Sequence, residues 1–293
     1  MPKQTKHLPV RGLLIHVSHY DPGWYRKKAK ESPFDPAVAI EAIGAMAEVG
    51  MNMLIIDCAD GVKYKSHPEL RKHYTVPMRQ LKKVADAAHR CGIEVVPKLN
   101  FSKSHRNHHD EWMAEHCLEH RWPHDQEYYR IAEDLFDELI QTCQPKRFFH
   151  IGMDEDHSRS LVQFVATIKK LHTILRKRRL RTVIWSDACH NNTSSIAQVH
   201  AEKCIAAEQL IPRDIVQMPW RYGKSCPSVV KRLTNKGFEV WVAPGWKLPD
   251  VKQWRRATLA GNGHGMILTT WRKCDQAHRD DLVELIRTSG AVL

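Results

Sequence analysis

The sequence contains no uninterrupted apolar stretch of the roughly 18 residues that a membrane-spanning helix requires. Its first residues, MPKQTKHLPVRG, have no apolar core followed by a small-residue cleavage site, which is the pattern of a secretory signal. We therefore expect no contact with a membrane and a cytoplasmic location.

Closely spaced cysteines are also lacking. The eight cysteines are scattered along the chain, and no two of them form the C-x-x-C pair that is typical of zinc and redox motifs. Reduced thiols in a cytosolic protein are the simplest interpretation of this pattern.

Two metal-binding motifs, H-E-x-x-H and the strand-one H-x-H of metal-dependent barrel hydrolases, are missing as well. His116 and His120 have the i, i+4 spacing that can hold a metal on one face of a helix. We expect these histidines to be structural or exposed, and we predict no metal and no cofactor. A metal-dependent hydrolase remains an alternative, which activity that survives EDTA would exclude.

Basic residues exceed acidic ones by 45 to 33, which gives a formal net charge of +12. Positive surface potential attracts polyanions, so a nucleic acid is one partner to consider. The densest basic run, R-K-R-R-L-R at residues 176–181, lies between a helical pattern and a strand pattern. Because the helix dipole alone favours cations at a helix C-terminus, we expect a solvated helix end here rather than a nucleic-acid site.

Short apolar runs alternate eight times with longer segments of helical spacing. The runs predict strands at residues 13–17, 53–57, 94–99, 147–152, 182–186, 215–219, 239–243 and 265–270. The clearest helices are predicted at residues 36–49, 77–90, 127–142, 160–176, 227–235 and 278–288, with a weaker one at 194–208. Eight β/α units in 293 residues favour the α/β class and a single (β/α)8 TIM barrel over residues 1–293. Residues 101–125 are expected to form a long loop or lid after strand three.

Polar and aromatic side chains follow the predicted strands at their C-terminal ends, where β/α barrels build active sites. Asp154 and Glu155 come directly after the apolar run F-F-H-I-G of strand four, and Asp60 follows strand two. Aromatic residues follow strands five to eight, namely Trp185, Trp220, Tyr222, Trp246 and Trp271. Aromatic faces pack against the C–H faces of sugars and carboxylates bind hydroxyls, so the pattern favours a carbohydrate site.

Each of these features also has a purely structural interpretation. An isolated Asp-Glu pair is usually a solvated helix N-terminus, where acids complement the dipole. A single Trp at a strand end usually packs the barrel rim. The recurrence of aromatic residues at successive strand ends, together with the carboxylate pair, favours a binding site.

The segment H-I-G-M-D-E from His150 to Glu155 resembles H-x-G-G-D-E, the signature of family-20 glycoside hydrolases, the β-N-acetylhexosaminidases. It differs from that signature at one glycine. Further similar segments follow in order along nearly the whole chain, namely Arg11-Gly12, M-N-M-L leading to Asp60, V-V-P-K-L-N-F from Val95, V-I-W-S-D from Val183, M-P-W-R-Y from Met218, and Trp271. The resemblance implies a barrel that releases terminal β-linked N-acetylhexosamine by a retaining, substrate-assisted mechanism.

The resemblance also implies roles for individual residues. Glu155 would be the general acid and then the general base, and Asp154 would orient the acetamide group of the substrate. The sugar-contacting residues would be Arg11, Trp185, Tyr222, Trp246 and Trp271, with Asp60 and His105 as a supporting pair. The expected partner is an N-acetylhexosamine-containing glycan.

Several departures from the family pattern add positive charge. Lys98 and Asn100 replace a Glu and an Asp, and Lys273 lies where the family has an acid after the last Trp. An anionic substituent on the sugar, such as sulfate, is therefore one expectation, and a catalytically silent glycan-binding barrel is an alternative. The family's usual companion domain has no counterpart here, which leaves completion of the site by a homodimer open.

Overall fold

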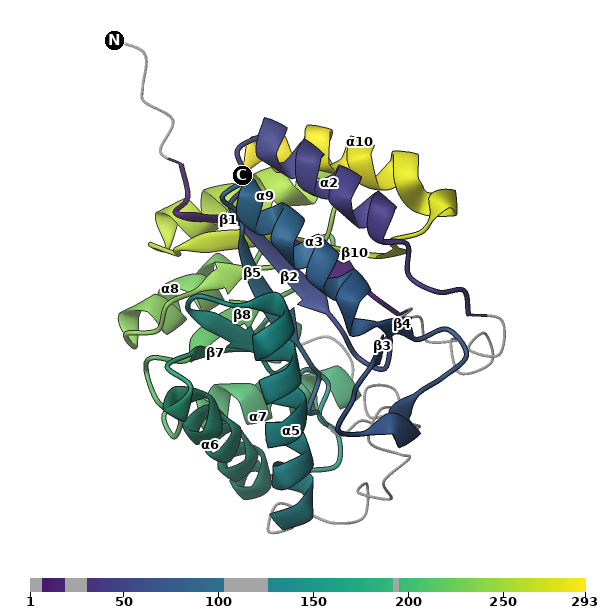
Figure 1. Cartoon of the computed structure of the whole chain (residues 1–293). Coiled ribbons are helices and arrows are strands. Elements are labelled where there is room, and N and C mark those ends of the chain that lie inside the picture. Colours follow the sequence, from purple (N-terminus) through teal and green to yellow (C-terminus); the bar gives the residue numbers. More distant parts are fainter. Residues whose placement is uncertain (1–6, 19–30, 103–125, 192–194) are drawn as a thin grey trace.

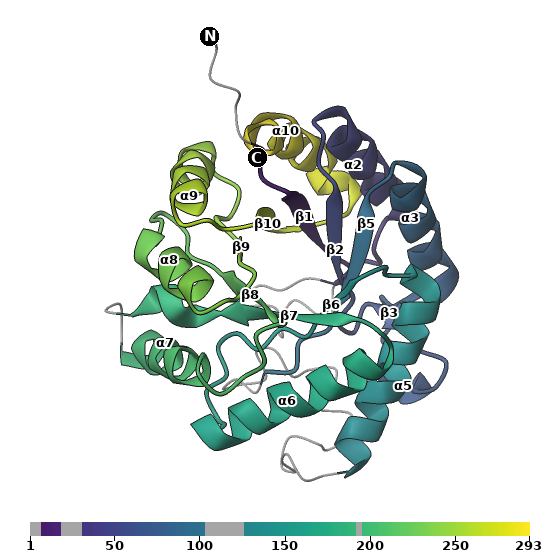
Figure 2. The same ribbon diagram turned by 90° about the vertical axis from the view of Figure 1, so that its left-hand side faces the viewer.

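Eight parallel strands form a closed ring in the computed structural model, which describes residues 7–18, 31–102, 126–191 and 195–293 (Figure 2). The strands are β1 (Val10–His16), β2 (Met53–Asp57), β5 (Glu94–Lys98), β6 (Phe148–His150), β7 (Arg181–Ser186), β8 (Val216–Pro219), β9 (Trp241–Val242) and β10 (Gly265–Lys273). Neighbours in the ring are neighbours along the chain, and β10 pairs with β1. Isolated parallel bridges from Gln217 to Val240 and from Trp220 to Ala243 close the ring between β8 and β9. The predicted (β/α)8 barrel is confirmed.

Helices surround the ring on its outside (Figures 1 and 2). They are α2 (Pro36–Glu48), α3 (Met78–Arg90), α5 (Gln126–Cys143), α6 (Leu161–Lys177), α7 (Ser195–Ala207), α8 (Pro227–Asn235), α9 (Leu248–Ala260) and α10 (Arg279–Ser289). Asp35 caps α2 by accepting a hydrogen bond from the N–H of Ala37, and Ser160 and Gln163 form a capping box at the start of α6. Local capping chemistry thus fixes where these helices begin.

Shorter elements complete the described chain. A small two-stranded sheet of β3 (Val62–Lys63) and β4 (Val76–Pro77) follows β2 and was not predicted. The 3-10 turns are η2 (Pro68–Leu70), η5 (Asp187–His190), η6 (Gln276–His278) and η7 (Gly290–Val292). Most of the predicted lid, together with His105, His116 and His120, lies outside the described residues.

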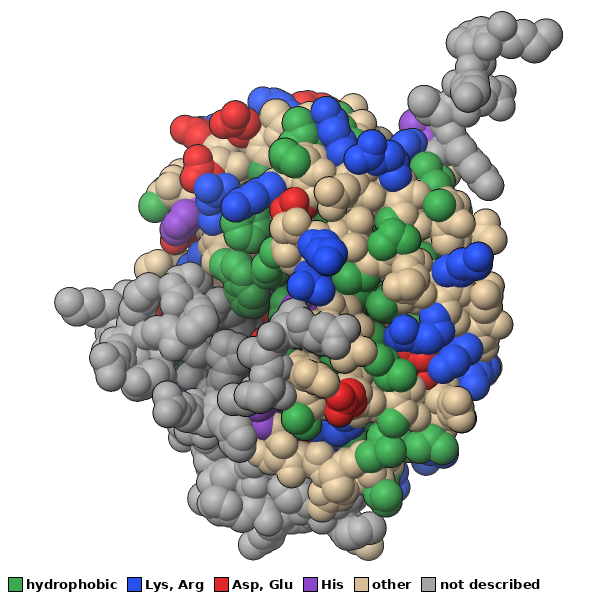
Figure 3. All heavy atoms as spheres, turned by 180° about the vertical axis from the view of Figure 1, so that it is seen from behind, with side chains coloured by type: hydrophobic (Ala, Val, Ile, Leu, Met, Phe, Trp, Pro, Cys, Tyr) green, Lys and Arg blue, Asp and Glu red, His purple; other side chains and the backbone are tan. Residues whose placement is uncertain are grey.

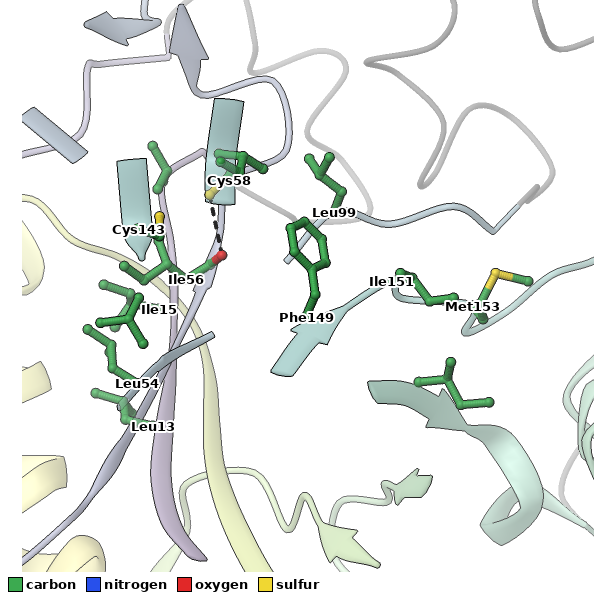
Figure 4. Close-up of a cluster of buried hydrophobic side chains, with 14 of the residues drawn as sticks. Leu13, Ile15, Leu54, Ile56, Cys58, Leu99, Cys143, Phe149, Ile151 and Met153 are labelled. Carbon is green, nitrogen blue, oxygen red and sulfur yellow. Dashed lines mark hydrogen bonds between the residues drawn. The ribbon is translucent and has the colours of Figure 1, made fainter. Parts of the chain in front are cut away.

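The core has two layers because successive side chains of a strand point to opposite faces. Side chains that point outward pack under the helices, and Figure 4 shows this layer with Leu13, Ile15, Leu54 and Ile56. Those that point inward fill the barrel, among them Leu14, Ile55, Val96 and Phe148. Because β2 is buried on both faces, its first four residues appear in the sequence as a continuous apolar run rather than as an alternating one.

Candidate active site

A row of polar side chains crosses the inside of the barrel one layer above the apolar filling. The row is in register across four neighbouring strands and consists of His16, Asp57, Lys98 and His150. Each of these residues lies two positions after an inward-pointing apolar residue, so strand geometry directs it inward at the C-terminal end. This is the end of a β/α barrel at which active sites form.

A pocket that is partly open to solvent lies over this row. It is lined by Leu14, His16, Asp57, Lys98, Asn100, Asp154, Trp185, Tyr222, Thr269, Thr270 and Trp271. Strands from both halves of the chain therefore contribute to one cavity, and four of the predicted site residues line it, namely Asp154, Trp185, Tyr222 and Trp271.

Asp154 is held by Asn100, which follows β5. The side-chain amide of Asn100 donates a 2.7 Å hydrogen bond to Asp154 Oδ1, and its carbonyl oxygen accepts one of 3.1 Å from the N–H of Met153. An amide donor binds the ionised carboxylate, whereas an Asp at position 100 would need a proton to do the same. Sequence reasoning noted Asn100 only as a departure from the family pattern, but it positions the first of the two predicted catalytic carboxylates.

The turn that carries Asp154 and Glu155 has left-handed backbone, with φ of +71° at Gly152, +82° at Met153 and +50° at Glu155. A Cβ at residue 152 would lie 2.7 Å from the Cα of Asn100 and would overlap its side-chain amide. The glycine of H-I-G-M-D-E is therefore required for Asn100 to reach Asp154. Met153 adopts its left-handed φ without that freedom, and its fully buried side chain packs into the core.

Changing Gly152 to Ala is expected to destabilise the protein by about 2–5 kcal/mol, the sum of left-handed strain and overlap with Asn100. Gly92→Ala is the matched control, because Gly92 has the same φ of +71° and open space around its Cα. The control should lose only about 1–2 kcal/mol. Urea denaturation measures both, and equal losses would show that Asn100 moves aside without penalty.

Asp187, at the start of η5, connects the turn that carries Asp154 and Glu155 to Trp220 through hydrogen bonds. Its Oδ2 accepts a 2.8 Å hydrogen bond from the N–H of Glu155, and its Oδ1 accepts one of 2.8 Å from the indole N–H of Trp220. Burial, with the nearby charge of Asp154, raises the pKa of Asp187 to about 8 although both hydrogen bonds oppose the shift. The only sequence signal for it is its position two residues after Trp185, at the end of a predicted strand.

Asp187→Asn is expected to make stability less dependent on pH. The raised pKa means that the folded state keeps a proton that the unfolded state has lost, so the contribution of Asp187 to stability declines as the pH rises from about 4 to about 8. The stability of the variant relative to that of the parent, measured as the difference in the free energy of unfolding, should therefore increase between pH 5 and pH 8. Asp280→Asn, at an exposed site on α10, is the control. Parallel pH profiles would mean that Asp187 is ionised throughout.

Three aromatic side chains wall the pocket, namely Trp185, Tyr222 and Trp271. Burial raises the pKa of Tyr222 to about 12, so its hydroxyl keeps its proton and can donate a hydrogen bond. Gly245, with φ of +82°, lets the Tyr222 ring lie against the backbone, since a Cβ there would come within 2.8 Å of it. Trp246 is outside the pocket lining and packs against Tyr222, with ring centroids 5.9 Å apart. Its predicted sugar contact stays a prediction.

Glu155 is half-buried and is not among the residues that line the pocket. Its charge acts on Tyr222, Asp187 and His190, so it lies at the edge of the site. Asp60 is buried behind the pocket lining, where its carboxylate accepts hydrogen bonds from the hydroxyls of Ser18 and Tyr74.

The predicted sugar contact of Arg11 is wrong. The Arg11 guanidinium donates hydrogen bonds to the carbonyl oxygens of Leu8 and Gly50. These groups lie at the N-terminal end of β1, opposite the pocket, because the strand begins at Val10 rather than at the predicted residue 13. Arg11 therefore stabilises the N-terminal end of the barrel, on the side opposite the pocket.

The two lysines that depart from the family pattern each have a carboxylate partner. Lys98 Nζ lies 2.7 Å from Asp57 Oδ2, which is also 3.3 Å from His16 Nδ1. Burial alone would raise the pKa of Asp57, but Lys98 and His16 hold it well below its usual range. Lys273 is buried 2.7 Å from Glu31 Oε1 and is not part of the pocket lining.

No group of three or more His, Cys, Asp or Glu side chains in the described ranges is arranged to hold a metal ion. None of the helices that the structure describes is long and apolar enough to cross a membrane. On the face shown in Figure 3, Lys and Arg side chains lie in several separate groups among apolar and polar ones.

No protein-family profile and no curated protein sequence matches this chain. Solved structures do match it. The β-N-acetylhexosaminidase from Bacteroides fragilis has a TM-score of 0.70 at 12% identity over 98% of this chain and 66% of that one. The chitobiase from Flavobacterium johnsoniae has a TM-score of 0.69 at 15% identity over 98% of this chain and 48% of that one.

Dispersin B matches with a TM-score of 0.60 at 16% identity over 97% of this chain and 98% of that one. The chain thus spans about half the length of the chitobiase and nearly all of dispersin B. Structural similarity at identities this low shows a common fold and no more. This fold is the one that the H-I-G-M-D-E resemblance implied. The chain has the (β/α)8 fold of the family-20 glycoside hydrolases.

Proposed function

We propose that this protein is a glycosidase that releases terminal β-linked N-acetylhexosamine by a retaining, substrate-assisted mechanism. The observation that carries the proposal is the position of Asp154, which is fixed by Asn100 in the wall of a pocket whose other walls include Trp185, Tyr222 and Trp271. A single sugar ring could lie against the aromatic faces with its acetamide group between Asp154 and Tyr222.

In the first half of the reaction, Asp154, Tyr222 and Glu155 each act on a different part of the substrate. The Asp154 carboxylate accepts a hydrogen bond from the acetamide N–H, and the Tyr222 hydroxyl donates one to the acetamide oxygen. Held in this way, the acetamide oxygen attacks the anomeric carbon and the glycosidic bond breaks. Glu155 gives its proton to the departing oxygen. Asp154 then lies next to the positive charge that develops on the oxazolinium-like ring.

The second half reverses the roles. Glu155, now a carboxylate, takes a proton from a water molecule that attacks the anomeric carbon from the side of the departed group. The acetamide oxygen leaves, and the sugar is released with its original configuration because two displacements have occurred.

The charges around the pocket favour a neutral sugar. Asp57 offsets Lys98 on the pocket floor, and Glu31 offsets Lys273 away from it. The positive charge that suggested a sulfated or phosphorylated sugar is therefore neutralised locally. An anionic substituent would also lie near the buried carboxylate of Asp57.

The test is release of aryl alcohol from neutral and 6-sulfated N-acetyl-β-glucosaminides and galactosaminides. We expect turnover of a neutral substrate and inhibition by N-acetylglucosamine-thiazoline, which mimics the oxazolinium-like intermediate. Faster turnover of a sulfated substrate would contradict the neutral sugar and support an anionic one. No turnover and no binding of the thiazoline would overturn the proposed function.

A catalytically silent glycan-binding barrel is the second candidate, and the basic residues Lys98 and Lys273, at positions where the family has acids, favour it. Binding of the thiazoline without turnover of any substrate would support this function. Homodimerisation and a cytoplasmic location stay predictions, which sedimentation and cell fractionation would test.

A further inference from the structure

Two cysteine pairs lie within the described residues, and their surroundings differ. Cys58 and Cys143 are both fully buried in the layer between barrel and helices (Figure 4). Burial, with the neighbouring Cys143, raises the pKa of Cys58 well above its usual range. This pair has the properties of inert core thiols.

Cys189 and Cys226 form the second pair, beside the candidate active site. Cys189 is buried in η5, two residues after Asp187, and Cys226 is half-buried at the N-cap of α8. The Cys226 thiol lies 3.8 Å from the Cys189 carbonyl oxygen, so the two residues are in direct contact. One partially accessible sulfur therefore faces one buried sulfur.

Arg221 completes the arrangement. Its guanidinium donates a 2.7 Å hydrogen bond to the Cys189 carbonyl oxygen and lies next to the Cys226 sulfur. A hydrogen bond from Cys189, together with the charge of Arg221, lowers the pKa of Cys226 to about 7. The lowered pKa enlarges the fraction of this thiol that is the nucleophilic thiolate near neutral pH.

We propose that Cys226 and Cys189 are a modification site that forms a reversible disulfide on exposure to a hydroperoxide. The Cys226 thiolate attacks one peroxide oxygen, so that an S–O bond forms, the O–O bond breaks and hydroxide leaves to become water. The Cys189 thiol then attacks the Cys226 sulfur. The S–S bond forms, the S–O bond breaks and a second water leaves, so two thiols are oxidised and one peroxide is reduced.

The disulfide would act on the groups that hold the catalytic turn. Cys189 shares η5 with Asp187, and Arg221 follows Trp220, whose indole binds Asp187. A bond of about 2 Å between the sulfurs draws η5 and the start of α8 together and alters the surroundings of Arg221, which binds the Cys189 carbonyl oxygen. We therefore expect oxidation to lower turnover. This expectation rests on the proposed function, whereas formation of the disulfide does not depend on it.

The experiment treats the folded protein with hydrogen peroxide, blocks the remaining thiols by alkylation and maps the peptides by mass spectrometry. We expect a Cys189–Cys226 peptide that has lost two hydrogen atoms and is restored by dithiothreitol. Before oxidation, Cys226 should be alkylated about tenfold faster than the exposed thiol of Cys91, as expected from its larger thiolate fraction. The Cys58–Cys143 pair should stay reduced and serves as an internal control.

Two variants make the test specific. Cys226→Ser should abolish the disulfide and keep the activity of the reduced parent. Cys189→Ser should leave a sulfenic acid on Cys226 that dimedone captures, because the second thiol is missing. Oxidation of Cys91 alone, or a Cys226 sulfenic acid in the parent that never becomes a disulfide, would overturn the proposal. These readouts are independent of whether any glycoside is hydrolysed.

Discussion

Glu155→Gln is expected to lower kcat on an aryl N-acetyl-β-glucosaminide by about 10²- to 10⁴-fold with little change in KM. Glutamine has the size and shape of glutamate but cannot transfer a proton. The turn itself should persist, because the hydrogen bond to Asp187 comes from the backbone N–H of residue 155 and not from its side chain. The loss should therefore lie in the chemical step.

Leaving groups separate proton transfer from misfolding. An aryl alcohol of low pKa leaves without a proton, so the Gln variant should lose much less in bond cleavage with a dinitrophenyl glycoside than with a methylumbelliferyl one. Glu202→Gln, at an exposed position on α7, is the matched control and should match the parent. Equal losses with both leaving groups would exclude Glu155 as the acid of the first step.

Lys98→Met is expected to lower the free energy of unfolding by about 3–5 kcal/mol, because it leaves the Asp57 carboxylate buried without its main partner. Asp57 is 1% exposed, and water cannot replace the ammonium group. The lowered pKa of Asp57 means that its favourable contribution is present above the unfolded pKa and is lost as the pH falls. The stability of the variant should therefore depend less on pH in the acidic range.

A double variant tests the cause. Adding Asp57→Asn to Lys98→Met removes the unpaired charge, so it should recover most of the lost stability. Lys82→Met, which breaks an exposed i, i+4 pair with Asp86, should change stability by only about 0.3–0.5 kcal/mol. If Lys98→Met were as mild as this control, the pocket would have to hydrate Asp57.

The barrel could be predicted from the sequence because each strand corresponds to a short apolar run that can be recognised locally. The predicted second strand agrees with β2 at both ends, and Gly50 and Gly92 have the left-handed φ expected just after helices. Helix α9 was not singled out. Its buried residues Val251 and Trp254 are separated by the polar Lys252 and Gln253, and its N-cap, Lys247, makes no capping hydrogen bond with its side chain.

The site could be predicted only in part. Strand ends located Asp154 and the aromatic wall, since the C-terminal end of a barrel strand is a position that the sequence specifies. The contacts that hold Asp154 and Glu155 join residues 54 and 32 positions apart, and no local pattern encodes them. For the same reason the sequence showed the charge of Lys98 but not its partner Asp57, and it suggested an anionic sugar.

The pairing of β10 with β1 has a consequence for synthesis on the ribosome. Thr269, Thr270 and Trp271 of β10 are translated about 250 residues after β1, and until then β1 is an unpaired sheet edge and the pocket lacks a wall. At about 5–20 residues per second this interval lasts on the order of ten to fifty seconds. Until β10 emerges, β1 is thus an open sheet edge of the nascent chain that needs protection by chaperones.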